Sequence, residues 1–128
     1  MRKKAAWKNY YYDGEYFDSL PELSFFLYNK LVKRNSIKRS NAVFIYEFNY
    51  KAYKYLPDFE IDGKLIEIKG DYLFKKMLIE NTKENAKYNC MLKNNIHIMT
   101  SKDYGPYVDW FHNQGYKKEN FTKKSYNI

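Results

Sequence analysis

Two acids and a lysine stand close together in the stretch PDFEIDGKLIEIKG, which runs from Pro57 to Gly70. The Asp-Gly pair at residues 62–63 lies between two runs of β-forming residues, which is a strong signal for a two-residue hairpin turn. Folding the chain back at this pair sets Asp58 opposite Glu67. Because side chains alternate along a strand, Asp58, Glu67 and Lys69 are expected to share one face of the hairpin.

The apolar residues of the same hairpin take the other face. The expected register sets Phe59 against Ile66 and Ile61 against Lys64. With Ile68, these apolar side chains then point away from the acids. The hairpin is therefore predicted to separate an apolar face from a charged one.

Two carboxylates that face each other across a hairpin need a counter-charge. Their Cβ atoms would lie about 4.5–5.5 Å apart, where like charges are destabilising. A divalent cation would offset this repulsion, since Mg²⁺ takes oxygen ligands and keeps waters for chemistry at a phosphate. Lys69 follows Glu67 by two residues and would reach the same site. Two acids and a lysine around a metal ion are suited to hydrolysing a phosphodiester.

This pattern resembles the signature of the PD-(D/E)XK nuclease superfamily: Pro57-Asp58, a short turn, and then Glu67-Ile68-Lys69. The resemblance implies an α/β fold with a restriction-endonuclease-like αβββαβ core, in which helices flank a mixed central sheet. It also implies a small, phage-type, Mg²⁺-dependent DNA endonuclease in which Mn²⁺ can replace Mg²⁺. Asp58, Glu67 and the Ile68 carbonyl would hold the metal ion, and Lys69 would be catalytic.

An acid on a preceding helix completes the site in that superfamily, and Glu22 is similar to it in placement. Glu22 would then be the fourth catalytic residue. However, Ser19 to Glu22 also form a capping-box pattern, in which the glutamate bonds the backbone at the start of a helix. The sequence leaves both roles of Glu22 open.

The remaining elements are expected to position these residues. An apolar stripe at helical spacing predicts a first helix over residues 18–35, with Leu23, Phe26, Leu27 and Leu31 on its buried face. Alternation and β-forming residues predict the strands, and helical periodicity predicts two further helices. The expected strands cover residues 42–50, 53–61, 64–70 and 95–100, and the expected helices cover residues 72–93 and 103–114. Poor helix formers around Asn81 indicate a kink or loop in the former helix.

The net charge of +8 is concentrated at the two ends of the chain, because residues 1–12 carry +4 and residues 115–128 carry +3. Basic ends favour contact with a polyanion such as DNA. Aromatic residues lie among these charges and would either stack on exposed bases or pack on the domain. The lysines expected to contact DNA are Lys3, Lys4, Lys8, Lys83, Lys87, Lys117, Lys118, Lys123 and Lys124.

Length and composition place limits on the class of protein. The 128 residues, of which 45% are hydrophobic, predict a single nuclease domain over residues 1–128 with arms at 1–12 and 115–128. One cysteine, Cys90, excludes a disulfide framework and suits a reducing compartment. No run of about 18 apolar residues is present, so no membrane association is expected. We expect a cytoplasmic protein of a bacterial or phage-infected cell.

The sequence offers no separate module for reading base edges in the major groove. A structure-specific or junction-resolving DNA endonuclease fits this best, since recognition of shape needs little extra structure. The alternatives are a homing or restriction-type endonuclease, a subunit guided by a protein partner, a catalytically inactive nucleic-acid-binding module, and a structural or inhibitory phage protein in which the motif is a coincidence. Cutting both DNA strands with one site per chain would favour a homodimer with twofold symmetry.

Overall fold

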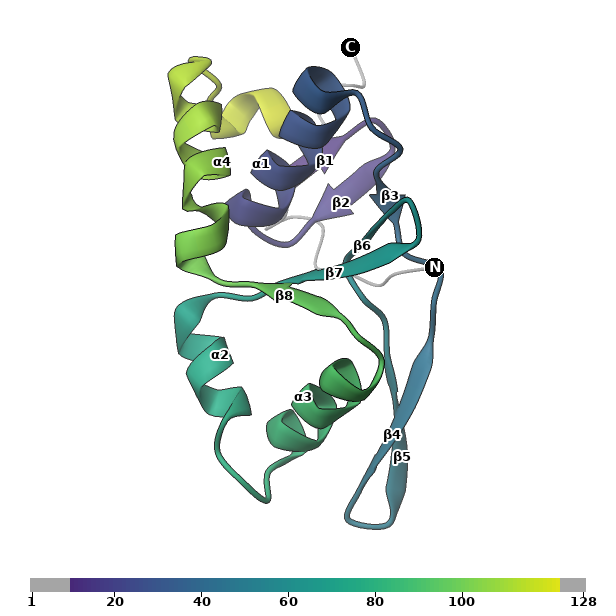
Figure 1. Cartoon of the computed structure of the whole chain (residues 1–128). Helices are drawn as coiled ribbons and strands as arrows, with labels where there is room; N and C mark the ends of the chain where they lie inside the picture. Colours follow the sequence, from purple (N-terminus) through teal and green to yellow (C-terminus); the bar gives the residue numbers. More distant parts are fainter. Residues whose placement is uncertain (1–9, 123–128) are drawn as a thin grey trace. The chain divides into compact units, whose positions relative to one another are not determined.

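The computed structural model describes residues 10–122 and has a mixed α/β fold (Figure 1). These residues form two compact units. The first combines the chain up to residue 34 with the chain from residue 104 onward, and the second covers residues 35–103. Helix α4 (Ser101–Asn113) begins in the second unit and continues in the first.

The first unit combines a short antiparallel hairpin with helices. Its elements besides α4 are β1 (Tyr10–Tyr12), β2 (Glu15–Phe17), α1 (Leu20–Leu27), the π-helix η2 (Tyr28–Lys33) and the 3₁₀ turn η3 (Lys118–Phe121). Aromatic side chains fill its interior. The ring centroids of Phe17 and Phe26 lie 4.9 Å apart, those of Phe111 and Phe121 lie 5.4 Å apart, and that of Tyr12 lies 6.1 Å from Phe121. Tyr12 and Phe121, which belong to the predicted arms, therefore pack within this unit.

The first predicted helix is confirmed at its start and differs at its end. The Ser19 hydroxyl accepts a hydrogen bond from the Glu22 backbone N–H at 3.4 Å, as an N-cap does. Regular α-helix ends at Leu27, and a π-helical segment follows. The prediction that Leu31 lies on the buried face is wrong, because the wider π-helical turn shifts its side chain off the apolar stripe. Leu31 is 42% exposed, whereas Leu23 and Leu27 are fully buried.

The second unit contains a mixed four-stranded sheet, a separate hairpin and two helices. Its elements are β3 (Lys38–Arg39), β4 (Phe44–Phe48), β5 (Lys51–Tyr55), β6 (Phe59–Ile61), β7 (Lys64–Ile68), α2 (Asp71–Met77), α3 (Lys83–Lys93) and β8 (His97–Met99). The sheet order is β3-β6-β7-β8, with β3, β6 and β7 antiparallel. Strand β8 is parallel to β7 and is reached through α2 and α3, since parallel strands need a crossover connection.

Two strand predictions need correction. Residues 53–61 were expected to form one strand, but β5 ends at Tyr55 and β6 begins at Phe59. Pro57 lies in the break, and it has no N–H to give to a strand ladder. Strand β4, predicted as residues 42–50 of the central sheet, instead pairs with β5 in a two-stranded sheet. The first strand of the four-stranded sheet is the two-residue β3, whose length is too short to leave a pattern in the sequence.

The predicted break in the helix over residues 72–93 is confirmed. Helix α2 ends at Met77, and Asn81 adopts a positive φ of 62° in the connection. Thr82 then caps α3, because its hydroxyl accepts a hydrogen bond from the Asn85 backbone N–H at 3.1 Å. The two helices therefore have separate ends rather than one kinked axis.

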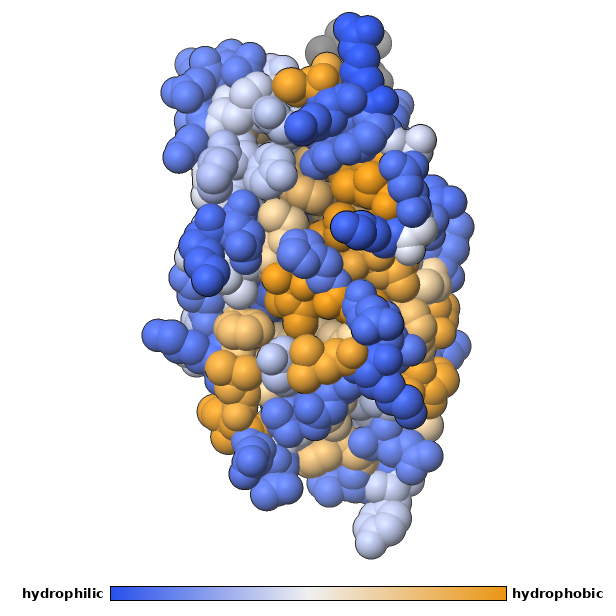
Figure 2. Space-filling model, in the orientation of Figure 1, coloured by the Kyte–Doolittle hydropathy of each residue, from blue (hydrophilic) through white to orange (hydrophobic). Residues whose placement is uncertain are grey.

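The core of the second unit lies around α3. The buried residues of this cluster are Tyr55, Met77, Cys90, Met91 and Ile96. Partly buried side chains from β4, β7 and β8 pack against them, so the cluster joins the hairpin, the helices and the sheet. Apolar side chains also reach the surface around α2 (Figure 2), where Leu73, Leu78 and Ile79 are about half exposed.

Candidate active site

The β6–β7 hairpin folds with the predicted turn and register. Asp62 and Gly63 have φ values of 49° and 84°, and a type I′ turn needs positive φ at both positions. Phe59 pairs with Ile66 and Ile61 pairs with Lys64. Since a slip of one residue would turn every side chain to the opposite face, this register decides where the acids point.

Asp58 lies directly before β6 and is tied to β7 by its side chain. Its Oδ2 accepts a hydrogen bond of 2.8 Å from the backbone N–H of Ile68, the residue after Glu67. Asp58 is 6% exposed. This bond brings the Asp58 carboxylate beside Glu67 and fixes its orientation.

Glu67 is 4% exposed, and each of its two oxygens has a partner. The Tyr55 hydroxyl donates a hydrogen bond of 2.7 Å to Oε1. Lys69 Nζ lies 3.4 Å from Oε2. The three residues predicted to meet, Asp58, Glu67 and Lys69, are therefore brought together on one side of the hairpin.

The electrostatics of the site reflect two acids in one buried place. Burial raises the pKa of Glu67, the charge of Asp58 raises it further, and the pKa reaches about 7 against an ordinary value of 4.5. Lys69 and the hydrogen bond from Tyr55 act in the opposite direction. Burial and the charge of Asp58 therefore outweigh the nearby cations at Glu67, and the pKa of its carboxyl stays raised.

Tyr55 is a site residue that the sequence analysis missed. It is 1% exposed, and burial together with the charge of Glu67 raises the pKa of its hydroxyl, which keeps the hydroxyl protonated as a donor. A tyrosine in the aromatic-rich run before Pro57 has the pattern of a packing residue. No signal in the sequence distinguishes it from Tyr53, two residues earlier.

Lys87 of α3, predicted as a DNA contact, lies next to this cluster. Its Nζ is 5.5 Å from the centroid of the Tyr55 ring. Burial lowers the pKa of Lys87, Lys69 lowers it further, and Glu67 and Asp58 oppose the shift. The site therefore has a second lysine close to the acids, supplied by a helix rather than by the hairpin.

The other predicted residues lie elsewhere. Glu22 is 5% exposed and occupies the first turn of α1 in the first unit, so its catalytic role stays a prediction. In that unit, Lys118 Nζ lies 5.9 Å from the Tyr10 ring centroid, and Lys117 N-caps η3. The predicted DNA contacts outside the described residues are Lys3, Lys4, Lys8, Lys123 and Lys124.

Among residues 10–122, no group of three or more His, Cys, Asp or Glu side chains could hold a metal ion. The donor set that the resemblance implies for Mg²⁺ is smaller, consisting of the Asp58 and Glu67 carboxylates with the Ile68 carbonyl. All three donors are oxygens, which is the chemistry that Mg²⁺ prefers, and its other positions can be filled by water and substrate phosphate. In donor chemistry, the two carboxylates therefore suit this ion.

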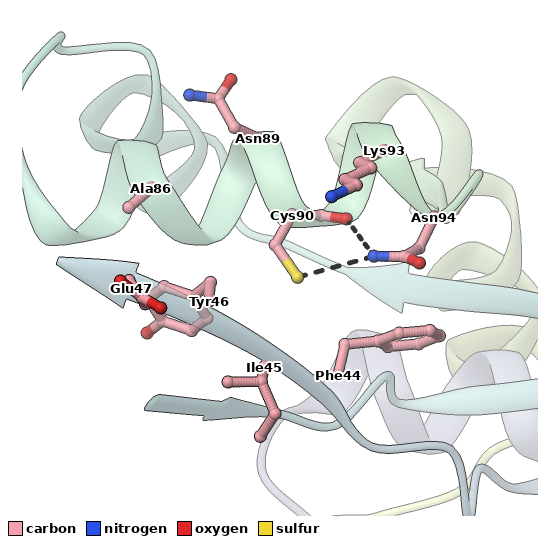
Figure 3. Close-up of a pocket in the computed structure, with 9 residues that line it drawn as sticks. All are labelled: Phe44, Ile45, Tyr46, Glu47, Ala86, Asn89, Cys90, Lys93 and Asn94. Atoms are coloured by element: carbon pink, nitrogen blue, oxygen red, sulfur yellow. Dashed lines mark hydrogen bonds between the residues drawn. The ribbon is translucent and has the colours of Figure 1, made fainter. Parts of the chain in front are cut away.

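A hollow of about 510 Å³ lies beside α3 but does not include the acids. Residues 44–47 of β4 form one wall, and α3 from Ala86 to its C-cap Asn94 forms the other (Figure 3). Its polar groups include Glu47 and Lys93, and the Asn94 amide donates a hydrogen bond of 2.8 Å to the Cys90 carbonyl. This hollow is separate from the Asp58–Glu67–Lys69 cluster.

Comparisons with protein-family models, with curated proteins and with solved structures find no match to this chain. None of the helices in residues 10–122 is long and apolar enough to cross a membrane.

Proposed function

We propose that this chain is a metal-dependent DNA endonuclease whose active site consists of Asp58, Glu67 and Lys69. The observation that carries the proposal is the pairing of two buried carboxylates, one with a pKa of about 7, beside a lysine 3.4 Å away. A fold gains little stability from such an arrangement, because burying two like charges is costly. Strongly shifted acids next to specific charged partners are a feature of functional sites.

The chain's own residues would hold the site ready for catalysis. Asp58 is oriented by the Ile68 N–H, and Glu67 is oriented by the Tyr55 hydroxyl. When bound to Asp58, Glu67 and the Ile68 carbonyl, Mg²⁺ would supply a Lewis acid and a water of lowered pKa. Lys69 would position the attacking water and stabilise the negative charge that develops on the phosphate.

The order of elements supports a PD-(D/E)XK core. Along the chain, α1 precedes β3, β6 and β7, and then α2, α3 and β8 follow. This is the helix, three strands, helix and strand order that the resemblance implies, with the β4–β5 hairpin inserted between its first two strands. The mixed sheet, with β8 parallel to β7, agrees with the same core.

DNA is the proposed substrate because of the charge of the chain. The net charge of +8 favours a polyanion, and Lys83 and Lys87 extend the basic character along α3 from the acids. Single-site chains that cut both strands would act as a symmetric dimer, so we propose a homodimer on duplex substrates.

The proposal is tested by incubating supercoiled plasmid with the full chain in Mg²⁺, in Mn²⁺ and in EDTA. We expect nicking or linearisation with either metal and none in EDTA. Glu67→Gln should remove cleavage, because it removes a charged ligand while keeping the shape of the side chain. The matched control is Glu60→Gln, since Glu60 lies on the neighbouring strand, is more exposed than Glu67 and has its own partner, Lys38, at 3.8 Å.

Linear duplex, single strands, four-way junctions and RNA, tested in parallel, would identify the substrate. Binding of DNA without cleavage in any metal would indicate the inactive nucleic-acid-binding module instead. Cleavage that Glu67→Gln leaves unchanged would contradict the assigned site.

A further inference from the structure

The turn of the β4–β5 hairpin carries a residue that the turn itself does not favour. Asn49 and Tyr50 have φ values of 50° and 64°. Asparagine tolerates positive φ, but a bulky residue rarely adopts it, and the left-handed conformation costs roughly 1–2 kcal/mol per residue. Glycine is the usual residue at the position of Tyr50, as in the Asp13-Gly14 and Asp62-Gly63 turns of this chain.

Tyr50 also gains nothing from packing. Its side chain is fully exposed, whereas Tyr53 and Tyr55 on the following strand turn inward. The hairpin tip projects from the second unit (Figures 1 and 2). A strained backbone and an exposed aromatic ring at one position indicate a role outside the fold, since such strain persists at sites that bind ligands.

The path from this tip to the acids is lined by lysines. Lys83 Nζ lies 3.9 Å from the Tyr53 ring centroid, and Lys87 Nζ lies 5.5 Å from that of Tyr55. Two residues of strand span about 6.6 Å and four residues of helix span about 6 Å. The spacing of the two lysines on α3 therefore matches the spacing of the two tyrosines on β5. Beyond Tyr55, Lys69 continues the series beside Glu67.

We propose that the β4–β5 hairpin is a DNA-binding arm on which Tyr50 stacks against an unpaired base while Lys83 and Lys87 contact the backbone of the same strand. A phosphate backbone is complementary to this row of positive charge, and an aromatic ring stacks on any base that is not held in a duplex. The inference rests on the proposed nuclease function and names its substrate class, which is DNA with a single-stranded segment.

The length of β5 places the stacked base. Tyr55, which bonds the proposed catalytic Glu67, lies five positions after Tyr50. At about 3.3 Å per residue these positions span roughly 17 Å, which is about five nucleotides at the stacked spacing of 3.4 Å. The base that contacts Tyr50 should therefore lie about five nucleotides from the cleaved phosphate.

The test is DNA binding by the full chain in EDTA, measured by fluorescence anisotropy with a blunt duplex and with the same duplex extended by a single-stranded arm. Tyr50→Gly should weaken binding of the armed probe by about fivefold to a hundredfold, the range for loss of one base–aromatic stack. It should leave the blunt probe unchanged. Tyr50→Phe, which keeps the ring, should bind both probes as the wild type does.

Tyr72→Ala is the matched control, because Tyr72 is also a well-exposed tyrosine of the second unit but lies on α2. It should bind both probes normally. A 2-aminopurine base moved along the arm should be quenched most at one position by the wild type and at none by Tyr50→Gly. Equal affinity of Tyr50→Gly and wild type for the armed probe, or equal weakening on both probes, would overturn the inference.

These outcomes separate the inference from the proposed function. If Tyr50 governs binding of the single-stranded DNA extension but Mg²⁺ brings no cleavage, the nuclease proposal fails and the β4–β5 hairpin remains a DNA-binding element. If the wild type cleaves DNA and Tyr50→Gly binds the extended probe normally, the role of the hairpin fails and the nuclease proposal stands.

Discussion

The two hairpins of the second unit share a turn geometry and differ in what that geometry serves. The β6–β7 turn uses Asp62 and Gly63, and glycine adopts its φ of 84° with little strain. The β4–β5 turn places Tyr50 at a φ of 64°, where a large side chain is disfavoured. The β6–β7 turn therefore has residues that its backbone conformation favours. The β4–β5 turn has Tyr50 at a position where the fold gives no reason for a tyrosine.

The two hairpins also differ in which side chains they bury and which they expose. The β6–β7 hairpin buries charge, with Glu67 at 4% exposure, and the β4–β5 hairpin exposes an aromatic ring at its tip. Burying the charge of Glu67 costs stability, and so does the positive φ of Tyr50, so neither arrangement is explained by stability of the fold. We therefore propose that one hairpin carries the reaction site and the other a contact surface, and the following predictions test that contrast.

The largest effect is expected at Lys69. Lys69→Ala removes the cation 3.4 Å from Glu67 and should lower single-turnover cleavage by about 10²–10³-fold, as loss of one electrostatic group does. Binding of the duplex with a single-stranded extension, measured in EDTA, should change far less, since the β4–β5 hairpin is intact. Cleavage at the wild-type rate would remove Lys69 from the site.

Without metal ions, the protein should lose stability as the pH rises. The pKa of Glu67 is higher in the folded protein, about 7, than its ordinary value of 4.5. The folded state therefore binds the Glu67 proton more tightly than the unfolded state does. The stabilisation of the fold by this proton is fully present below pH 4.5 and is lost as the pH rises through about 7. The loss should approach about 3 kcal/mol.

Glu67→Gln removes the pH dependence that Glu67 contributes to stability, because glutamine resembles the protonated glutamate at every pH. In chemical denaturation with EDTA, wild type and Glu67→Gln should have similar stabilities near pH 5, and the variant should be the more stable near pH 8. A stability difference that does not change with pH would contradict the burial of a charged pair.

Replacing the glycine of the β6–β7 turn should be costly. Gly63→Ala meets no atom within 4 Å, so its effect is conformational, and at a φ of 84° it should destabilise the fold by about 1–2 kcal/mol. Because the turn sets the register of the acids, cleavage should fall as well. Denaturation midpoints and cleavage rates measured on one preparation check both expectations.

The smallest effect should have the opposite sign. Tyr50→Gly relieves strain at a φ of 64° but gives the unfolded chain more freedom, so a net stabilisation of about 0.5 kcal/mol is expected. Thermal denaturation measures it. Marked destabilisation would show that Tyr50 supports the fold and would remove the contrast between the two turns.

The sequence was most informative where structure is set locally. An Asp-Gly turn fixes the register of its own hairpin, so the face shared by Asp58, Glu67 and Lys69 follows from residues close in the chain. The break near Asn81 was also local, since it depends on helix formers and a cap. These features need no knowledge of distant partners.

Features set by distant partners were not predictable. Whether β5 continues into β6 depends on which strands pair with each, and β3 is two residues long. Tyr55 contacts Glu67 only because the β4–β5 hairpin packs beside the sheet, so nothing in its own segment marks it. The two roles predicted for Glu22 both stay predictions, because a helix cap and a catalytic acid use the same residue type.

Whether Asp58 and Glu67 share a divalent cation is measured by metal binding. Mn²⁺ is titrated with the full chain near pH 8 and the free ion is followed by electron paramagnetic resonance. We expect saturable binding by wild type and by Glu60→Gln, and its loss in Asp58→Asn and Glu67→Gln. Absence of binding by the wild type, or equal binding by all four proteins, would contradict a shared cation.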